Sequence, residues 1–417
     1  MLVWPIFSST ESTDSFMTEK MYIIGAGPGS EELLTLKASN VIHSADRVLG
    51  TQRIARHYQR CTGLHLSELF KELEHPVAGV TAVLVGGDCC FYSVTSRIRR
   101  DFSSLYEIEQ INGIGSLAYF SAKIGINYDD ARLISFHGRN ERTVSLAAYN
   151  KKVFVLAGGE HKVHDLCREL LSSGLANVQT IVGEKLSYSD EKIVYGTPAT
   201  LENETFDDLS VMYIGNENAR CPHLPLRDDD FIRFENIPMT KEEVRRLTLG
   251  KLAISPKDIL YDIGAGTGSV AVEMGRHAFE GIVYAVERHS EACRLIEMNR
   301  VRHGAYNINV VHADAPEGLD RLPPPDAAFI GGSSGSIKSV IDVLITKNPA
   351  VRIVANAVSL QGLYRIHEAF QRFDPREIEV TCVNIAQSKR IDVYDLMTAQ
   401  NPVYIICRHP CFPSRES

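Results

Sequence analysis

Short runs of β-branched and aromatic residues alternate with amphipathic stretches along the chain after residue 20. Runs of the first kind predict strands, and several of the stretches between them have helical spacing. In the first half, strands are expected at 21–26, 47–50, 81–87, 106–113, 131–138, 151–158, 178–187, 191–197 and 209–216. Helices are expected between several of these strands, for example at 31–45 and 115–125. This alternation predicts an α/β protein.

The alternation is interrupted between residues 218 and 238 and then resumes. This segment contains three prolines and an Arg followed by three Asp, without sustained apolar periodicity, which is typical of a linker. A helix is expected at 240–252, where Thr240 and Glu243 have capping-box spacing. Seven strands follow, at 258–264, 281–287, 308–314, 326–332, 352–358, 378–386 and 401–408. They predict a doubly wound domain.

Three regions and a linker follow from this pattern. We expect a first domain at 20–217, a linker at 218–236 and a second domain at 237–417. Residues 1–19 carry a short apolar patch without the basic start of a signal peptide. We expect them to be a disordered extension or to precede the true start.

Composition excludes several classes of protein. The net charge of -8 argues against non-specific binding of nucleic acid or of a membrane surface. Apolar runs stay shorter than the roughly 18 residues that span a bilayer. The nine cysteines are scattered without C-x-x-C spacing, so we expect reduced thiols, no metal site and a cytoplasmic location.

The glycines at 264, 266 and 268 follow an expected strand directly. A dinucleotide fingerprint would place its third glycine at position 269, where this chain has Ser269. Glu287 ends the next strand, where its carboxylate could accept bonds from ribose hydroxyls, and Asp314 ends the third, within reach of an adenine edge. In a parallel sheet these strand ends share one rim. The pattern resembles class I S-adenosylmethionine (SAM) methyltransferases. The same residues would also be found if the glycines formed only a tight turn, Glu287 a solvated strand end and Asp314 an Asx-turn.

Five segments make the resemblance narrower. "PMTKEEVRRL", "DIGAGTGSVAVE", "HADAPEGL", "FIGGSSG" and "NAVSL" resemble the C-terminal half of the precorrin-6Y C5,15-methyltransferase (decarboxylating) family, over about residues 237–408. The resemblance implies a Rossmann-like class I domain that binds SAM. The implied SAM contacts are Thr240, Gly264, Ala265, Gly266, Thr267, Gly268, Glu287, Asp314 and Ala315.

The first half has its own glycine loop, "MYIIGAGPGS" at 21–30, but the strand after it ends in glycine rather than in an acid. "LVGGDCCFYS", "INGIGSLAYFSAKIG", "LISFHGR" and "GEKLSYSDEKIVYGT" resemble the tetrapyrrole (corrin/porphyrin) methylase family, over about residues 21–215. That family is two-lobed and holds SAM between its lobes. The implied contacts are Gly86, Gly87, Asp88, Phe91, Gly115, Ser116 and Leu156.

The first half departs from its family at two positions. Cys89 and Asn112 stand where the family usually has proline. Losing a proline costs loop rigidity, so these positions put turnover in this half in doubt more than fold or SAM binding.

The two resemblances together imply one activity in cobalamin biosynthesis. Precorrin-6Y would be methylated at C5 and C15 and lose the carboxyl group of its ring C acetate, giving precorrin-8. Each domain would use one SAM, the partner would be a polycarboxylate tetrapyrrole, and the related families are homo-oligomers. Methyl transfer is an in-line displacement that depends mainly on positioning, which fits the absence of a catalytic triad or metal cluster from the sequence.

Few polar residues are candidates for handling such a substrate. His137 and Arg139 in "FHGR" could reach its carboxylates, and Asn356 at a strand end could hydrogen-bond to it. The pairs Arg245–Arg246 and Lys389–Arg390 could supply positive charge. The same residues could have no role in binding: His137 and Arg139 could lie in an exposed turn, Asn356 could cap a turn, and each basic pair could lie on a solvent-exposed face.

Three alternatives remain at this point. One is a SAM-dependent methylase of another precorrin or tetrapyrrole. Another is an NAD(P)-dependent oxidoreductase with two Rossmann sites, which the glycine spacing disfavours. The third is a non-catalytic module that binds SAM or a tetrapyrrole, because the two missing prolines could mark a degenerate half.

Overall fold

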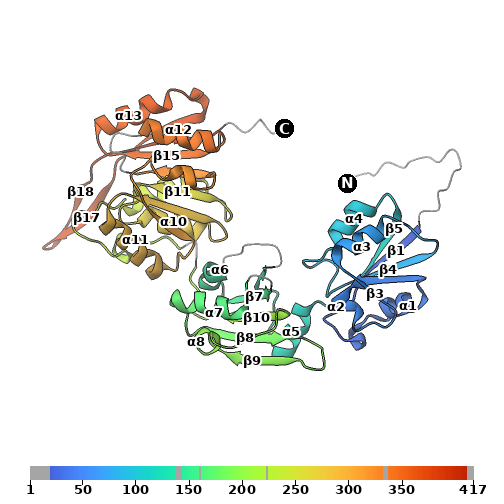
Figure 1. Cartoon of the computed structure of the whole chain (residues 1–417). Coiled ribbons are helices and arrows are strands. Elements are labelled where there is room, and N and C mark those ends of the chain that lie inside the picture. The colour runs from blue at the N-terminus through green and yellow to red at the C-terminus, as the bar shows by residue number, and fades with distance from the viewer. Residues whose placement is uncertain (1–18, 137–142, 159–160, 222–223, 332–336, 411–417) are drawn as a thin grey trace, which may run out of the picture.

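The computed structural model describes residues 19–136, 143–158, 161–221, 224–331 and 337–410. Figure 1 shows three α/β units in chain order, drawn in blue, in green, and in yellow to red. The first two units are the two lobes of the amino-terminal half, and the third is the carboxy-terminal half. The predicted fold class, a two-lobed domain followed by a doubly wound domain, is confirmed.

The first lobe is a five-stranded parallel sheet in the order β3-β2-β4-β1-β5. Its elements are β1 (Glu19–Gly25), η1 (Glu31–Leu33), α1 (Leu36–Ser44), β2 (Arg47–Thr51), α2 (Gln52–Ala55), β3 (Thr62–Leu64), α3 (Leu66–Leu73), β4 (Val80–Val85), α4 (Thr95–Phe102) and β5 (Tyr106–Ile111). Because the strands are parallel, β1, β4 and β5 end at the same edge, where three glycine-containing turns follow them.

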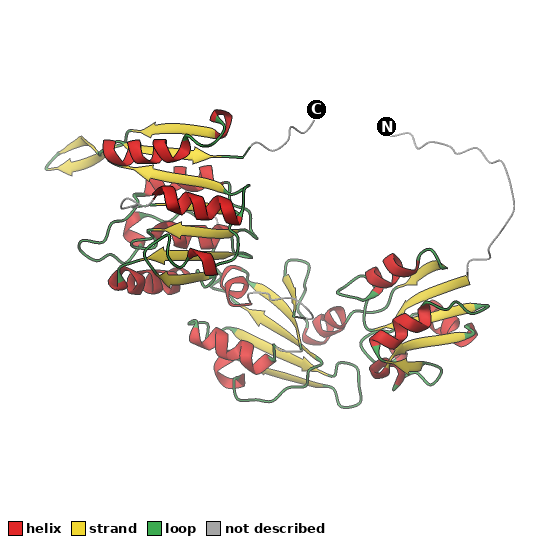
Figure 2. Cartoon of the chain, turned by 45° about the horizontal axis from the view of Figure 1, so that its top comes forward, coloured by secondary structure: helices red, strands yellow, loops and turns green. Residues whose placement is uncertain are grey.

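The second lobe is a mixed sheet in the order β6-β7-β10-β8-β9, in which only β6 and β7 are parallel. Its elements are α5 (Ser116–Ile124), β6 (Arg132–Ser135), α6 (Thr143–Tyr149), β7 (Lys152–Ala157), α7 (Val163–Ser172), β8 (Gln179–Glu184), β9 (Lys192–Gly196), α8 (Pro198–Leu201) and β10 (Ser210–Gly215). Figure 2 shows α5 between the two sheets of this half.

The carboxy-terminal half has a seven-stranded sheet in the order β13-β12-β11-β14-β15-β19-β16, with β19 antiparallel to both neighbours. Its elements are η2 (Asp228–Asp230), α9 (Glu242–Leu252), β11 (Ile259–Ile263), α10 (Ser269–His277), β12 (Ile282–Glu287), α11 (Ser290–His303), β13 (Ile308–His312), η3 (Leu319–Arg321), β14 (Ala327–Ile330), α12 (Ile337–Lys347), β15 (Arg352–Ala357), α13 (Leu360–Phe370), η4 (Pro375–Glu377), β16 (Ile378–Val383), β17 (Ala386–Ile391), β18 (Tyr394–Ala399) and β19 (Val403–Arg408). Strand order reverses between β11 and β14, and a ligand crevice is expected at such a point.

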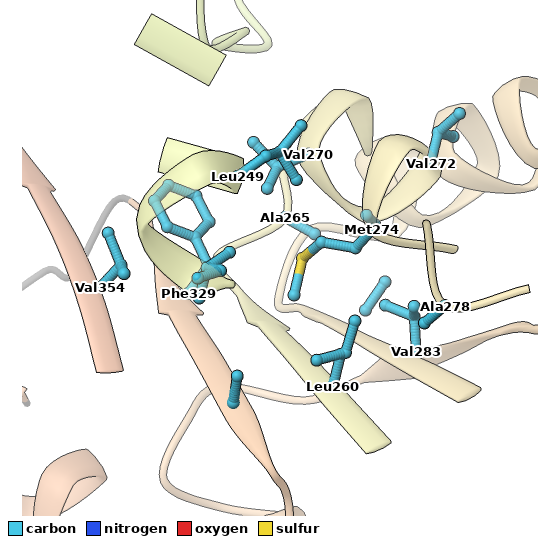
Figure 3. Close-up of a cluster of buried hydrophobic side chains, with 14 of the residues drawn as sticks. Leu249, Leu260, Ala265, Val270, Val272, Met274, Ala278, Val283, Phe329 and Val354 are labelled. Carbon is cyan, nitrogen blue, oxygen red and sulfur yellow. The ribbon is translucent and has the colours of Figure 1, made fainter. Parts of the chain in front are cut away.

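The core of this half explains why its strands are continuous apolar runs. Leu260, Val283 and Phe329 from three neighbouring strands pack against Val270 and Met274 of α10, as Figure 3 shows. Helices cover both faces of the sheet, so residues on both sides of each central strand are buried. The glycine turn that links β11 to α10 is therefore held between two rigid elements.

Three strands were not predicted. β3 has only three residues, and β17 and β18 form a hairpin whose residues are all exposed. The apolar pattern that predicts a strand comes from residues facing a core, so strands that pack against no core lack this pattern. In Figure 1 this hairpin projects from the rest of the carboxy-terminal half.

Part of the expected linker packs onto the carboxy-terminal half. Phe231 belongs to the core of that half, and Asn299 exchanges hydrogen bonds with both backbone groups of Ile232. Asp228 forms an ion pair with Arg245, at 3.1 Å. Residues 226–232 are thus structurally part of the carboxy-terminal half.

The second lobe contacts the carboxy-terminal half directly. Arg132 forms an ion pair with Glu280 at 2.5 Å, and the Tyr149 hydroxyl donates to the carbonyl of His303 at 3.1 Å. Glu280 and His303 precede β12 and β13, so this contact is at the amino-terminal edge of the seven-stranded sheet.

Candidate functional site

A cavity of about 1490 Å³ opens at the opposite edge of that sheet, where β11, β12 and β14 end. Most of the residues predicted for the second half line it: Thr240, Gly264, Ala265, Gly266, Glu287, Asp314, Ala315 and Asn356. Thr267 and Gly268 shape the turn behind the cavity instead. Thr267 is 1% exposed and its carbonyl accepts from Asn299, while Gly268 is the left-handed N-cap of α10.

The backbone amides of the glycine turn are all engaged within the protein. Gly264 and Ala265 donate to the Val286 carbonyl at 2.9 and 3.2 Å, and Gly266 donates to Glu287. Thr267 donates to Pro238 and Gly268 to Ala265. A dinucleotide loop offers such amides to a pyrophosphate, and here a carboxylate occupies that position. The turn therefore does not fit the oxidoreductase alternative.

Glu287 is held so that its oxygens face the turn and the cavity. Its Oε2 accepts from the Gly266 amide at 3.0 Å and its Oε1 accepts from the His289 amide at 2.9 Å. The residue is 6% exposed and lines the cavity. Each carboxylate oxygen has lone pairs beyond those two bonds, so the side chain can still accept two neighbouring hydroxyl groups.

The segment before α9 covers the glycine turn. Gly266 has φ +54°, and a Cβ there would lie 2.7 Å from the Pro238 carbonyl oxygen, so only glycine fits. The predicted capping box is wrong: Lys241 is the N-cap of α9 and gives no side-chain cap. Glu243 instead accepts from Gln387 in the hairpin, which leaves the Thr240 side chain without a capping role.

Asn356 lies on another wall of the cavity with a fixed amide orientation. The Thr248 hydroxyl donates to the Val244 carbonyl at 2.8 Å, so its oxygen accepts the Asn356 Nδ2 group at 3.0 Å. Asn356 Oδ1 is buried and has no hydrogen-bond partner among the residues that the structure describes. An unsatisfied buried acceptor at a cavity wall favours a ligand that donates a hydrogen bond.

The hairpin supplies a wall that the sequence did not reveal. Gln387, Ser388, Lys389 and Thr398 line the cavity. The exposed strands gave no core pattern, and only the basic pair Lys389–Arg390 drew attention to this segment.

The structure separates the four basic candidates. Arg245 is fully buried, with Glu273 at 2.6 Å and Asp228 at 3.1 Å, so the proposal that it faces a ligand is wrong. Arg246 pairs with Glu242, and Arg390 pairs with Asp395 at 3.6 Å. Lys389 lines the cavity, and no carboxylate among the described residues forms an ion pair with it.

One buried acid lies beneath the glycine turn. Burial is the main cause that raises the pKa of Asp262, to about 7; the Ala271 amide opposes this rise and the nearby Glu287 charge adds to it. Asp262 is on β11 and is not among the residues that line the cavity.

In the amino-terminal half, the three glycine turns converge at the edge where β1, β4 and β5 end. Gly27 and Gly87 exchange backbone hydrogen bonds, at 2.8 and 3.3 Å. A Cβ on Gly113 would lie 2.2 Å from the Gly25 carbonyl, and one on Gly115 would lie 3.5 Å from Asp88 Cβ. The predicted residues Gly86, Gly87, Asp88, Gly115 and Ser116 therefore lie together.

The other two predicted residues of this half come from different lobes and lie at one cluster. Phe91, after β4, and Leu156, on β7, pack against the same apolar cluster around Phe120. His137 and Arg139 lie outside the described residues. The first glycine loop is covered rather than open, because the Tyr188 ring lies over Gly29 and the Ser30 amide donates to Ser187 at 2.9 Å.

Sequence reasoning missed Arg53 in this half. A Cβ on Gly86 would lie 2.8 Å from the Arg53 guanidinium, so this cation is adjacent to the turn after β4. Arg53 lies on the four-residue helix α2, whose pattern is too short to suggest a role.

Comparisons with known proteins give the family of each half. Residues 20–202 match the tetrapyrrole (corrin/porphyrin) methylases, and residues 234–408 match the precorrin methyltransferase domain. A crystal structure of precorrin-6Y C5,15-methyltransferase from Geobacter metallireducens is 37% identical, with a TM-score of 0.42, and covers 45% of this chain and 97% of its own. No helix in the described part of the chain is long and apolar enough to cross a membrane.

Two curated relatives match different extents of the chain. A "Probable cobalt-precorrin-6B C(15)-methyltransferase (decarboxylating)" from Pyrobaculum calidifontis is 39% identical over 187 residues, which are 44% of this chain and 94% of the relative. The precorrin-6Y C(5,15)-methyltransferase [decarboxylating] of a Sinorhizobium species is 30% identical over 367 residues, which are 84% of this chain and 87% of the relative. A match of this extent spans both halves, and the chain therefore belongs to the precorrin-6Y C(5,15)-methyltransferase (decarboxylating) family of SAM-dependent methyltransferases.

Proposed function

We propose that the two halves methylate one macrocycle, each with its own SAM. The amino-terminal half methylates C5 of precorrin-6Y. The carboxy-terminal half methylates C15 and removes the carboxyl group of the ring C acetate, which gives precorrin-8. The relative of about half this length, named for C(15) methylation with decarboxylation, supports assigning both steps to one half.

The carboxy-terminal cavity carries this proposal. A drug-sized ligand occupies a pocket of roughly 300 to 1,000 Å³, whereas this cavity measures about 1490 Å³. It has room for SAM along the strand ends and for part of a macrocycle beside it. Glu287 lines the cavity from the end of β12, Asn356 from β15 and Lys389 from the hairpin.

The residues fit SAM better than a phosphate-bearing cofactor. Glu287 would hold the ribose hydroxyls and Asp314 the adenine edge, and no turn amide remains for a phosphate. When bound, SAM supplies a methyl group on a positively charged sulfur. The chain has to place an electron-rich macrocycle carbon in line with that methyl group, and Asn356 and Lys389 would orient the macrocycle through its polar edge and its carboxylates.

In the amino-terminal half the second SAM would lie against the turns after β4 and β5, with Phe91 of the first lobe and Leu156 of the second lobe closing the site. The convergence of these turns supports this placement. Arg53 would face a carboxylate of the macrocycle.

Two further features belong to the proposal. Ile391, Tyr394 and Met397 on the hairpin are each more than half exposed, and an apolar group of this kind supports a homo-oligomer. The scattered cysteines support a cytoplasmic location.

The test is to incubate the purified protein with SAM and precorrin-6Y and to follow product mass. We expect the product to gain two methyl groups and lose carbon dioxide, and calorimetry to count two SAM per chain. Binding of NAD(P) without binding of SAM would overturn the proposal, as would a product that gains neither methyl group.

A further inference from the structure

We propose that Asn112 is a positioning residue for the SAM site of the amino-terminal half, an inference that rests on the proposed function. It follows β5 and is not itself expected to touch the cofactor. Its side-chain oxygen joins the turn after β4 to the turn after β5, the two turns proposed to hold SAM.

The joint consists of two hydrogen bonds to one atom. Asn112 Oδ1 accepts from the Cys89 amide at 2.9 Å and from the Gly113 amide at 3.0 Å. Cys89 directly follows Asp88, and Gly113 is two residues before Gly115. The Cys89 bond crosses from one turn to the other, so a movement of one turn relative to the other breaks it, while the Gly113 bond fixes the Asn112 side chain within its own turn.

Cys89 is anchored through its thiol as well. The residue is 3% exposed, and its Sγ lies 3.3 Å from the Ile111 carbonyl and 3.6 Å from the Ile23 carbonyl. Burial raises the pKa of this thiol to about 11, so it stays protonated and can donate. Residue 89 is thus connected to β5 through both its amide and its side chain.

The spacing around these turns leaves little tolerance for movement. Gly25, Gly87 and Gly113 pack backbone to backbone, because a Cβ on Gly113 would lie 2.2 Å from the Gly25 carbonyl and 2.8 Å from the Gly87 carbonyl. Gly87 in turn approaches the amide of Ser116, to which its Cβ would lie at 3.8 Å. A small shift of the β4 turn would change the gap between the proposed SAM contacts on both sides.

Cys89 and Asn112, the two positions where the family usually has proline, are therefore in contact with each other. A proline at position 89 would lack the amide that donates to Asn112, and a proline at position 112 would lack the acceptor. Where two prolines would restrict each turn separately, this chain links the turns to each other by a hydrogen bond. The geometry favours a functional rather than a degenerate amino-terminal half.

The test compares N112L, which has similar size and no acceptor, with N112D, which retains an oxygen in the same place. N112L loses one or two of the hydrogen bonds that Asn112 Oδ1 accepts, and this loss should raise the SAM KM for C5 methylation about tenfold. We expect kcat at saturating SAM to change less than twofold, because the site still closes around bound SAM. N112D should return the KM to within about threefold of wild type.

Two controls are built into the full-length protein. C15 methylation, which the accompanying loss of carbon dioxide marks in the product mass, should keep its SAM KM in every variant. N150L is a matched control, since it also removes a side-chain hydrogen bond of an asparagine in this half, the one that Asn150 donates to the Leu146 carbonyl at the end of helix α6 in the second lobe. Its C5 methylation should keep the wild-type KM.

The proposal is overturned if N112L keeps the wild-type KM for C5 methylation. It is also overturned if N112L loses kcat without a change in KM, or if N150L shows the same rise, because either result indicates general destabilisation. Failure of the proposed function would be visible earlier and separately, as a wild-type protein that binds a single SAM or adds no methyl group at C5.

Discussion

The Gly266 amide nitrogen lies 3.0 Å from Glu287 Oε2, and this hydrogen bond joins the turn after β11 to the end of β12. It fixes a negative charge at the place where a dinucleotide site would receive phosphate. The same carboxylate keeps lone pairs for ribose hydroxyls, so in the proposed SAM site this bond would orient the group that binds the cofactor.

Replacing Glu287 should weaken one SAM site and spare the other. Hydrogen bonds to a charged group contribute about 1.5 to 3 kcal/mol each, so E287Q should lower SAM affinity at the carboxy-terminal site by at least about tenfold. Titration calorimetry on the full chain measures both sites at once. E297Q, which removes a carboxylate paired with Arg300 on α11, is the control. Equal affinities in E287Q and wild type would contradict the proposed role.

Lys389 and Arg390 offer a matched pair on one strand. Lys389 lines the cavity, whereas Arg390 pairs with Asp395 on β18. K389Q should raise the KM for the tetrapyrrole in C15 methylation by about tenfold at low salt and less at high salt, because the lost interaction is electrostatic. R390Q should change it little. The SAM KM shows whether Lys389 binds a carboxylate of the tetrapyrrole or that of SAM. A rise in the SAM KM would mean that Lys389 binds the methionine carboxylate of SAM instead.

The position of a cut before the carboxy-terminal half should decide whether that half folds stably. A piece that begins at residue 219 keeps Asp228, Phe231 and Ile232, whereas one that begins at 237 loses the Arg245 partner, a core aromatic and the Asn299 contacts. Losing a buried aromatic alone costs about 3 to 5 kcal/mol. The shorter piece should therefore melt at least about 10 °C lower by circular dichroism. Equal melting temperatures would show that the segment contributes nothing.

Asp262 should make stability depend on pH. Its pKa is about 7 in the folded state and ordinarily about 3.9 in an unfolded chain, so the folded protein holds this proton more strongly. That contribution is present at low pH and is lost as pH rises from about 4 through about 7. Between pH 5 and pH 8 the loss is about 2 to 3 kcal/mol. D262N removes this titration.

Scanning calorimetry of both proteins at pH 5 and pH 8 measures the effect. The wild-type transition should fall relative to that of D262N by about 5 to 10 °C between the two pH values. A difference that does not change with pH would mean that Asp262 stays ionised in the folded protein.

The central strands of all three sheets could be predicted because burial on both faces leaves uninterrupted apolar runs. Glu287 and Asp314 could be placed on one rim because parallel strands end at a common edge. The hairpin wall could not be predicted, since strands β17 and β18 pack against no core. The burial of Arg245 could not be predicted either, because its two acidic partners, Asp228 and Glu273, are distant in the sequence and lie beside it only in the folded chain. The link between Cys89 and Asn112 depends on a loop contact 23 residues apart, which no local pattern reports.

If each half methylates as proposed, the contact of Arg132 with Glu280 has a consequence for how an intermediate passes between the two centres. It joins the halves at the amino-terminal edge of the seven-stranded sheet, and the large cavity opens at the other edge, so docking does not seal the cavity mouth. A half-methylated product that leaves this mouth enters solvent before it meets the other half. Holding both centres in one chain would then raise the local concentration of the second centre around that intermediate. A competing free enzyme added in excess should intercept the intermediate.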